Sequence, residues 1–272
     1  MPIKLIAIDL DGTLLNDARE ITPAVQEAIA AARRQGVRVV LATGRPLVGV
    51  QRYLQELALD TAGEYCLCNN GGLVVHADSG EVLFETSLDY DDYRYLEALA
   101  REVGSHFHAL DAGRLFTANR DISKYTVHEA FITGIPLHFC PAESMDPTLR
   151  FPKMMMIDHP EVLEAAIARI PSSVFQRYTL LRSSPFFLEI LHRDVDKGKG
   201  IARLAQHLGI ERQSVMCIGD HGNDLAMIEY AGLGVAMGNA DAAILAAAQY
   251  VTASNREDGV AQAIRQWVLN AA

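Results

Sequence analysis

The sequence is poor in cysteine, with only Cys66, Cys68, Cys140 and Cys217 among its 272 residues. Their spacing matches neither a disulfide framework nor the C-x-x-C pattern of redox and zinc sites. A chain of this length can also form a core without disulfide bonds. We therefore expect free thiols, and we expect Cys66 and Cys68 to share one face of a buried strand, because alternate residues of a strand point the same way.

Long apolar runs and an excess of basic residues are also missing. No window holds 18 consecutive apolar residues, and no basic stretch followed by an apolar segment opens the chain. These absences predict a cytoplasmic protein that does not enter a membrane. The formal net charge of −10 disfavours nucleic acids and anionic membranes as partners. The composition leaves the choice between a monomer and a homodimer open.

A short apolar segment near the start of the chain, Leu5–Ile8, ends in the carboxylate of Asp9. A continuous apolar run of this length is typical of a strand buried on both faces of a parallel sheet. Asp11 follows two residues later, with Gly12 and Thr13 behind it. Ligands of open α/β sheets bind at the carboxyl ends of the strands, so both carboxylates would lie where chemistry takes place. A surface Asp-Gly turn is the alternative, and this stretch alone does not decide between the two.

The segments that follow repeat the alternation of helix and strand. A helix begins at Thr22-Pro23, and strands are predicted at residues 37–42 and 65–68. We expect Pro46 to open another helix, whose first N–H groups near Thr43 and Gly44 would suit an oxyanion. Strand, helix and strand in this order predict an α/β fold with a doubly wound, mostly parallel sheet.

The character of the chain changes from residue 73 onward, where a predicted hairpin and then shorter mixed segments follow. We expect residues 84–193 to form an inserted α+β domain, with residues 1–83 and 194–272 as the core. Within the insertion, His106 and His108 alternate on a strand and are expected to be satisfied or exposed rather than metal ligands. Glu189 could face the substrate, but it is expected on an exposed strand face.

The first pattern resumes at residue 194, and another buried strand, residues 215–218, leads into Gly219-Asp220. If this strand neighbours the first one, Asp9, Asp11, Asp220 and Asp224 converge. Four carboxylates in a small volume raise one another's pKa unless a cation is present, and oxygen ligands of this kind suit Mg²⁺. The alternative is that Asp224 only caps its helix, which would leave Asp220 unexplained.

Lys197 begins a predicted helix, where a positive charge opposes the helix dipole. A nearby anion would explain this placement. Lys199, two residues later, is more typical of a solvated surface lysine.

Four motifs together resemble the haloacid dehalogenase superfamily, and they occur in the order of its Cof-type subgroup. They are Asp9-Leu10-Asp11-Gly12-Thr13, Thr43-Gly44-Arg45, Lys197 and Gly219-Asp220-His221-Gly222-Asn223-Asp224. The resemblance covers the whole chain and implies a C2B-type cap inserted after the second motif. It further implies a Mg²⁺-dependent phosphatase of small phosphorylated metabolites, with sugar phosphates as the first candidates.

The resemblance also implies roles for individual residues. Asp9 would be the nucleophile that forms an aspartyl-phosphate, and Asp11 would act as general acid and base. The implied Mg²⁺ ligands are Asp9, Asp11 through its backbone carbonyl, Asp220 and Asp224. The implied phosphate ligands are Leu10, Thr43, Gly44, Lys197 and Asn223. A phosphomutase of the phosphomannomutase type would share these motifs, and a non-enzymatic phospho-acceptor is a third alternative.

Overall fold

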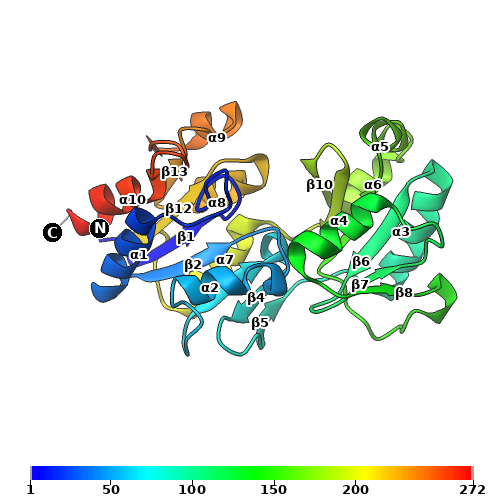
Figure 1. Ribbon diagram of the computed structural model, residues 1–272, viewed down its shortest axis with the longest axis horizontal. Coiled ribbons are helices and arrows are strands. Elements are labelled where there is room, and N and C mark those ends of the chain that lie inside the picture. The colour runs from blue at the N-terminus through cyan, green and yellow to red at the C-terminus, as the bar shows by residue number, and fades with distance from the viewer. Residues whose placement is uncertain (1, 271–272) are drawn as a thin grey trace. The chain divides into compact units, whose positions relative to one another are not determined.

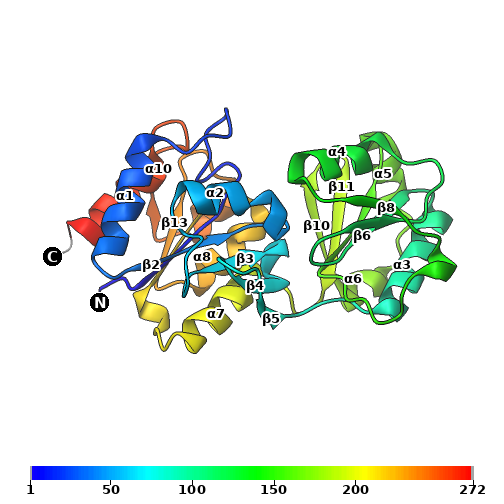
Figure 2. The same cartoon turned by 60° about the horizontal axis from the view of Figure 1, so that its bottom comes forward.

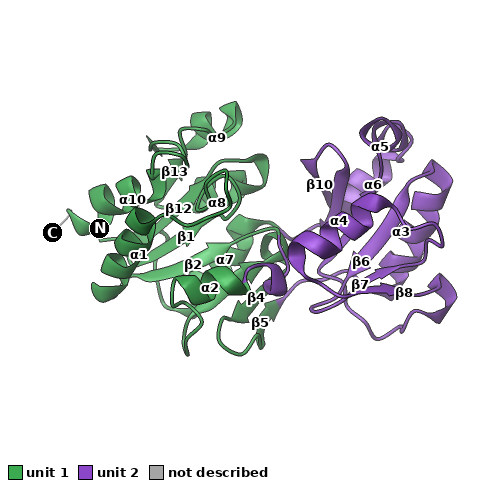
Figure 3. Ribbon diagram, viewed as in Figure 1, with its two compact units in different colours: residues 1–44, 51–84, 196–272 green, residues 45–50, 85–195 purple. Residues whose placement is uncertain are grey.

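The computed structural model describes residues 2–270, which form two compact units (Figure 3). Within the described residues, unit 1 comprises residues 2–44, 51–84 and 196–270, and unit 2 comprises residues 45–50 and 85–195. Unit 2 thus includes Arg45–Val50, which the sequence analysis placed in the core. The reason is local packing, because a Cβ on Gly49 would lie 3.5 Å from Thr133 of unit 2.

Unit 1 is built on an eight-stranded sheet with the order β14-β13-β12-β1-β2-β3-β4-β5. The pairs from β14 to β3 are parallel, and β4 runs antiparallel to β3. This confirms the predicted doubly wound, mostly parallel sheet. Its strands are β1 (Leu5–Ile8), β2 (Arg38–Ala42), β3 (Tyr65–Cys68), β4 (Leu73–His76), β5 (Val82–Glu85), β12 (Val215–Gly219), β13 (Leu233–Ala236) and β14 (Tyr250–Val251).

Helices cover both faces of this sheet (Figure 2). Buried apolar residues of α7, α8 and α9 form one cluster with the strands, while α1 and α10 pack together on the opposite face. The two helical layers bury the central strands completely, which explains their continuous apolar sequences. The helices are α1 (Pro23–Arg34), α2 (Gln51–Glu56), α7 (Lys197–His207), α8 (Leu225–Tyr230), α9 (Ala242–Ala247) and α10 (Gly259–Ile264).

The central strand β1 lies between β2 and β12 (Figure 1). Leu5 is paired with Val215 and Ile8 with Ile218, so the two strands end side by side. The backbone N–H of Asp9 continues the ladder by donating to Ile218 O at 3.0 Å. The sequence analysis required these two strands to be neighbours, and this register confirms that they are.

Unit 2 contains a six-stranded sheet with the order β10-β11-β9-β6-β7-β8. Its pairs are antiparallel except for β7 with β8, in agreement with the expected α+β insertion. The strands are β6 (His106–Leu110), β7 (Leu115–Thr117), β8 (Leu137–Phe139), β9 (Lys153–Ile157), β10 (Tyr178–Ser184) and β11 (Phe187–His192).

The two faces of this second sheet carry different helices. Apolar residues of α3 (Tyr90–Val103), α5 (Pro160–Ile167) and α6 (Ser172–Arg177) pack with Phe107, Met154 and Met156 on one face. On the other face α4 (Lys124–Thr133) packs with Met155 and Phe187 (Figure 2). Met154, Met155 and Met156 are therefore core residues.

Some local predictions were wrong. Pro46 opens only a single 3-10 turn, Leu47–Gly49, and the α-helix α2 begins later, at Gln51. The strand β8 and the helix α6 were not predicted. β8 has only three residues, too few for an alternation to be recognised in the sequence, and two of them are exposed.

All four cysteines are free thiols. Cys66 and Cys68 are fully buried with their sulfur atoms 3.7 Å apart, which confirms that they share one face of β3. Among residues 2–270, no helix has the length and apolar composition that crossing a bilayer requires.

Candidate active site

Three carboxylates meet at the carboxyl ends of the central strands of unit 1. Asp9 follows β1, Asp220 follows β12, and Asp224 ends the short turn that leads into α8. One oxygen from each of the three lies within 4.8 Å of the others. The parallel register of β1 and β12 produces this convergence, because it brings both strand ends to the same edge of the sheet.

Lys197 lies inside this cluster. Its Nζ is 2.5 Å from Asp9 Oδ1 and 2.6 Å from Asp224 Oδ1, and its side chain is fully buried. Burial by itself would lower the pKa of Lys197, but Asp224 and Asp9 hold that pKa above its usual value. The lysine therefore stays charged. Its unfavourable place at the start of α7 is explained by two carboxylates of the protein itself.

Asp224 organises the surroundings of the cluster with both of its oxygens. Oδ1 accepts the Lys197 bond, while Oδ2 accepts hydrogen bonds from the backbone N–H groups of Asp220 (2.9 Å) and His221 (3.0 Å). Asp224 thus fixes the turn that carries Asp220, and its side chain makes no capping hydrogen bond to α8, the helix that follows. With both oxygens engaged, Asp224 is less suited to contact a cation directly than Asp9 or Asp220.

Gly12 and Thr13 hold the carboxylate of Asp220. Thr13 Oγ1 donates to Asp220 Oδ1 at 2.8 Å. Gly12 has φ +84°, and a Cβ there would collide with the Asp220 carboxylate. The position therefore requires glycine both for its backbone conformation and for the close approach of a side chain.

The cluster holds more negative charge than Lys197 can neutralise. Burial, and then Asp224, raise the pKa of Asp9 well above its usual value, although Lys197 acts in the opposite direction. Burial raises the pKa of Asp220 to about 6, against the effect of its bond from Thr13. In their fully ionised state, the three carboxylates together with the one ammonium carry a net charge of −2. The all-oxygen donor set and this excess charge fit a hard divalent cation such as Mg²⁺.

The remaining predicted residues lie at neighbouring strand ends of unit 1. Leu10 is fully buried, and Asp11 is exposed in a backbone bridge with Leu15. Thr43 is buried and donates its N–H to Leu67 O at 2.9 Å, which ties the end of β2 to β3. Asn223 lies in the turn that also carries Asp224.

Sequence reasoning missed Asn70, which lies two residues after the end of β3. Its Oδ1 accepts a hydrogen bond from Asn223 Nδ2 at 3.0 Å, and its N–H donates to Thr43 O at 2.9 Å. It therefore connects two of the predicted segments. The rule that drew attention to Asp9, which singles out polar residues at strand ends, applies equally to Asn70.

Glu189, His106 and His108 are polar residues of the unit 2 sheet. The expectation for Glu189 was wrong: its side chain is buried and lies 3.5 Å from Lys153 Nζ, which is also 3.4 Å from Glu129 of α4. The cause is α4, which covers this face of the sheet. His106 pairs with Asp158 at 2.8 Å. His108 is fully buried, with Nδ1 3.3 Å from Thr126 Oγ1.

His108 should make the protein sensitive to acid. Burial, with a contribution from Lys153, lowers the pKa of His108 to about 3 from an ordinary value of 6.5. Below pH 6.5 the unfolded chain takes up a proton at this residue, while the folded chain stays neutral until near pH 3, so stability falls as the pH falls through this window. We expect His108→Gln to remove about 2 kcal/mol of the stability loss between pH 7 and pH 5.

Urea denaturation of both proteins at the two pH values, followed by circular dichroism, measures this difference. Equal pH dependence in wild type and His108→Gln would contradict the burial of a neutral imidazole.

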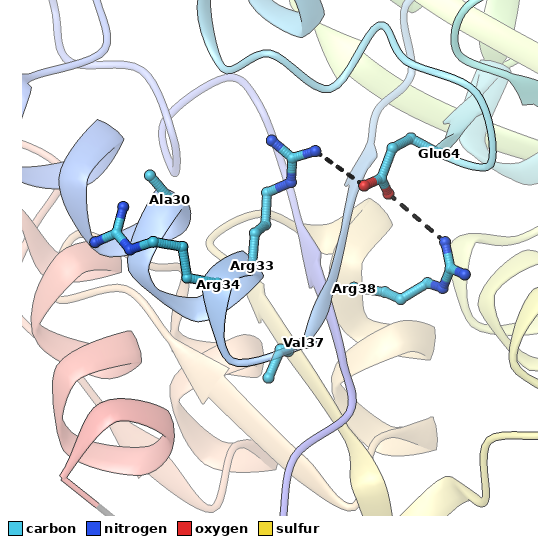
Figure 4. A pocket seen from close by; sticks show the side chains of 7 residues that line it. Ala30, Arg33, Arg34, Val37, Arg38 and Glu64 are labelled. Atoms are coloured by element: carbon cyan, nitrogen blue, oxygen red, sulfur yellow. Dashed lines mark hydrogen bonds and ion pairs between the residues drawn. The ribbon is translucent and has the colours of Figure 1, made fainter.

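A cleft of about 530 Å³ lies elsewhere on unit 1, at the amino end of β2 (Figure 4). It is lined by Ala30, Arg33, Arg34, Gly36, Val37, Arg38 and Glu64. Because β1 and β2 are parallel, this is the sheet edge opposite Asp9. Glu64 lies 3.0 Å from Arg33 and 4.0 Å from Arg38, so two of the three guanidinium groups already face a carboxylate. We assign no chemistry to this cleft.

Comparison with known proteins agrees with this geometry. The model of a family described as haloacid dehalogenase-like hydrolases matches residues 6–264. YxeH of Bacillus subtilis (strain 168) is 52% identical over 98% of this chain and 98% of its own length. YcsE of the same organism, a 5-amino-6-(5-phospho-D-ribitylamino)uracil phosphatase, is 34% identical over 98% of this chain and 96% of its own. The solved structure of the haloacid dehalogenase subclass IIB sugar phosphatase BT4131 is 25% identical, with a TM-score of 0.80 over 97% of this chain and 98% of that one.

Proposed function

The chain belongs to the haloacid dehalogenase-like hydrolases, and we propose that it is a Mg²⁺-dependent phosphatase of small phosphorylated metabolites, with sugar phosphates as the first candidates. The observation that carries this proposal is the buried cluster of Asp9, Asp220 and Asp224 around Lys197 at the carboxyl ends of β1 and β12. Such a cluster can place a carboxylate nucleophile beside a bound cation and a fixed positive charge, as phosphoryl transfer requires.

The relatives support the type of substrate. YcsE is named for a phosphorylated ribityl compound, and BT4131 is named as a sugar phosphatase. Both substrates present a phosphate ester on a small polyhydroxylated carbon chain. We propose that this chain acts on the same class and that residues 84–193 form a cap of the C2B type.

In the proposed reaction, Asp9 attacks phosphorus with one carboxylate oxygen while the bond from phosphorus to the leaving oxygen breaks. Asp11 gives its proton to that oxygen, which leaves as an alcohol. An aspartyl-phosphate on Asp9 results. Asp11, now ionised, takes a proton from a water that attacks the same phosphorus, which releases inorganic phosphate and restores Asp9.

Mg²⁺ would be held by the Asp9 carboxylate, the backbone carbonyl of Asp11 and Asp220, with Asp224 as the outer residue that fixes the turn. When bound, the ion supplies neutralisation of the charge on Asp9 and on the phosphoryl group.

The protein itself would contribute the other phosphate ligands, which come from four separate segments of unit 1. Lys197 would offer its ammonium group, already held between two carboxylates. The other donors would be the Leu10 N–H, Thr43, the Gly44 N–H and the Asn223 side chain. Fixed donors of this kind stabilise the charge that develops in the transition state without a cost of reorganisation.

A phosphate-release screen across phosphorylated metabolites tests the proposal, with Mg²⁺ present and Asp9→Asn as the blank. We expect release of inorganic phosphate from at least one sugar or polyol phosphate. An isomerised sugar phosphate without free phosphate, dependent on a bisphosphate primer, would instead identify a phosphomutase. Phosphorylation of the protein without turnover would identify a phospho-acceptor.

Chelation should silence the enzyme. With EDTA in excess we expect phosphate release to fall to the level of the blank, because the cluster loses the charge that balances its carboxylates. Added Mg²⁺ should restore the activity. Phosphate release that is unaffected by EDTA, after verified removal of bound metal, would rule out the metal assignment.

A further inference from the structure

The turn after β3 combines a disfavoured backbone with buried amide side chains. Asn69, Asn70 and Gly71 all have positive φ, at +50°, +56° and +96°. Asparagine tolerates this region better than most residues, but two in succession still cost stability. Within residues 2–270 neither polar side-chain atom of Asn69 has a hydrogen-bond partner, although the side chain is fully buried. A turn with these costs persists because its surroundings hold it.

Asn70 contacts two other segments from this turn. Its N–H donates to Thr43 O at 2.9 Å, and its Oδ1 accepts from Asn223 Nδ2 at 3.0 Å. Its amide also lies against Gly44, where a Cβ would be 3.1 Å from Asn70 Oδ1. Asn70 is itself 98% buried. Thr43 and Gly44 follow β2, which neighbours β3 in the sheet, and Asn223 lies in the turn after β12, which neighbours β1.

Each contact controls the direction of a donor. In a trans peptide the C=O and the N–H point in opposite directions, so a bond that fixes Thr43 O also fixes the Gly44 N–H. The side-chain amide of Asn223 carries two N–H groups. Asn70 accepts one of them and thereby sets the plane in which the other must lie.

We propose that Asn70 is a positioning residue that holds two phosphate donors, the Gly44 N–H and the Asn223 amide, at a fixed separation. The inference rests on the proposed function, because it assumes that these two groups meet an anion. It adds a residue outside the four motifs to the phosphate site. Asn70 acts through its neighbours and needs no contact with the substrate.

Calorimetric binding of inorganic phosphate in the presence of Mg²⁺ tests the proposal without turnover. Asn70→Gly keeps the positive φ and the backbone N–H bond to Thr43 O, and it removes the side-chain amide that holds Asn223. We expect it to raise the dissociation constant of phosphate about tenfold, since a bond to a charged group is weakened. The matched control is Asn69→Gly, which keeps the same backbone and removes an amide that touches neither donor. We expect the control to bind phosphate as wild type does.

A double-mutant cycle with Asn223→Ala isolates the contribution of the Asn70–Asn223 hydrogen bond to phosphate binding. Once Asn223 has been truncated, Asn70→Gly should weaken phosphate binding by clearly less than it does in wild type. In steady-state assays the Asn70→Gly variant should raise KM for a phosphate ester more than it lowers kcat. Circular dichroism at the assay temperature confirms that each variant is folded.

The outcomes separate this inference from the function on which it rests. Unchanged phosphate affinity in Asn70→Gly, or equal weakening in Asn69→Gly, would overturn the role of the Asn70 amide and leave the phosphatase proposal intact. Full additivity with Asn223→Ala would also overturn it. Wild-type protein that binds no phosphate and releases none from any ester would overturn both.

Discussion

Replacing Asp9 with asparagine is expected to abolish phosphate release while the protein stays folded. The amide cannot attack phosphorus, and removal of the nucleophile from a covalent mechanism costs on the order of 10⁵-fold or more in kcat. The substitution keeps the shape of a side chain that is 5% exposed. Phosphate release in single-turnover and steady-state assays measures the loss.

The same substitution should leave the protein as stable as wild type or more so. Burial and Asp224 raise the pKa of Asp9, so the folded state binds a proton there more tightly than the unfolded state does. Ionised Asp9 therefore costs stability at neutral pH, and a neutral amide removes that cost. Lys197 keeps its bond to Asp224.

A matched control is Asp17→Asn. Asp17 lies in the same loop as Asp9, between β1 and α1, and its exposed carboxylate pairs with Arg256. This control should change neither the rate of phosphate release nor the urea midpoint measurably. Turnover by Asp9→Asn within tenfold of wild type would exclude Asp9 as the nucleophile. A lower urea midpoint for this variant would show that ionised Asp9 is a net stabilising partner of Lys197.

Replacing Lys197 with methionine is expected to lower both stability and activity. The variant leaves Asp9, Asp220 and Asp224 close together and removes the ammonium group that bonds Asp9 and Asp224. Removal of one partner from a buried ion pair typically costs roughly 3–5 kcal/mol of unfolding free energy, and we expect a loss in this range for Lys197→Met. Loss of a fixed phosphate donor should remove about 3–4 kcal/mol of transition-state stabilisation.

The control for this prediction is Lys199→Met, two residues along the same helix. Lys199 has an exposed side chain whose ammonium group lies 3.3 Å from Asp196, and exposed pairs contribute about 0–1 kcal/mol. Addition of Asp9→Asn to Lys197→Met should recover part of the lost stability, because it removes one of the repelling carboxylates. Urea unfolding without metal compares Lys197→Met with Lys199→Met and with the double variant. Equal midpoints for Lys197→Met and Lys199→Met would show that the buried ion pairs contribute no net stability.

Several features of this protein could be predicted from local sequence. Burial on both faces makes a central strand continuously apolar, so β1 and β12 were visible as short runs. Each run ends in a carboxylate, and the general preference for ligands at strand ends indicated Asp9 and Asp220 as candidates. The start of the helix at Lys197 could also be predicted, because the capping of a helix depends on residues that are close in sequence.

The tertiary structure decided which of these local features meet. Pairing of β1 with β12 brings Lys197 and Asp9 together across 188 residues of sequence, which no local periodicity encodes. Alternation along a strand shows which residues share a face, but it does not show whether a helix covers that face. For this reason Glu189 was predicted as exposed and is buried under α4. Asn70 acquires its partners in the same way, since Thr43 and Asn223 reach it only after the strands have assembled into one sheet.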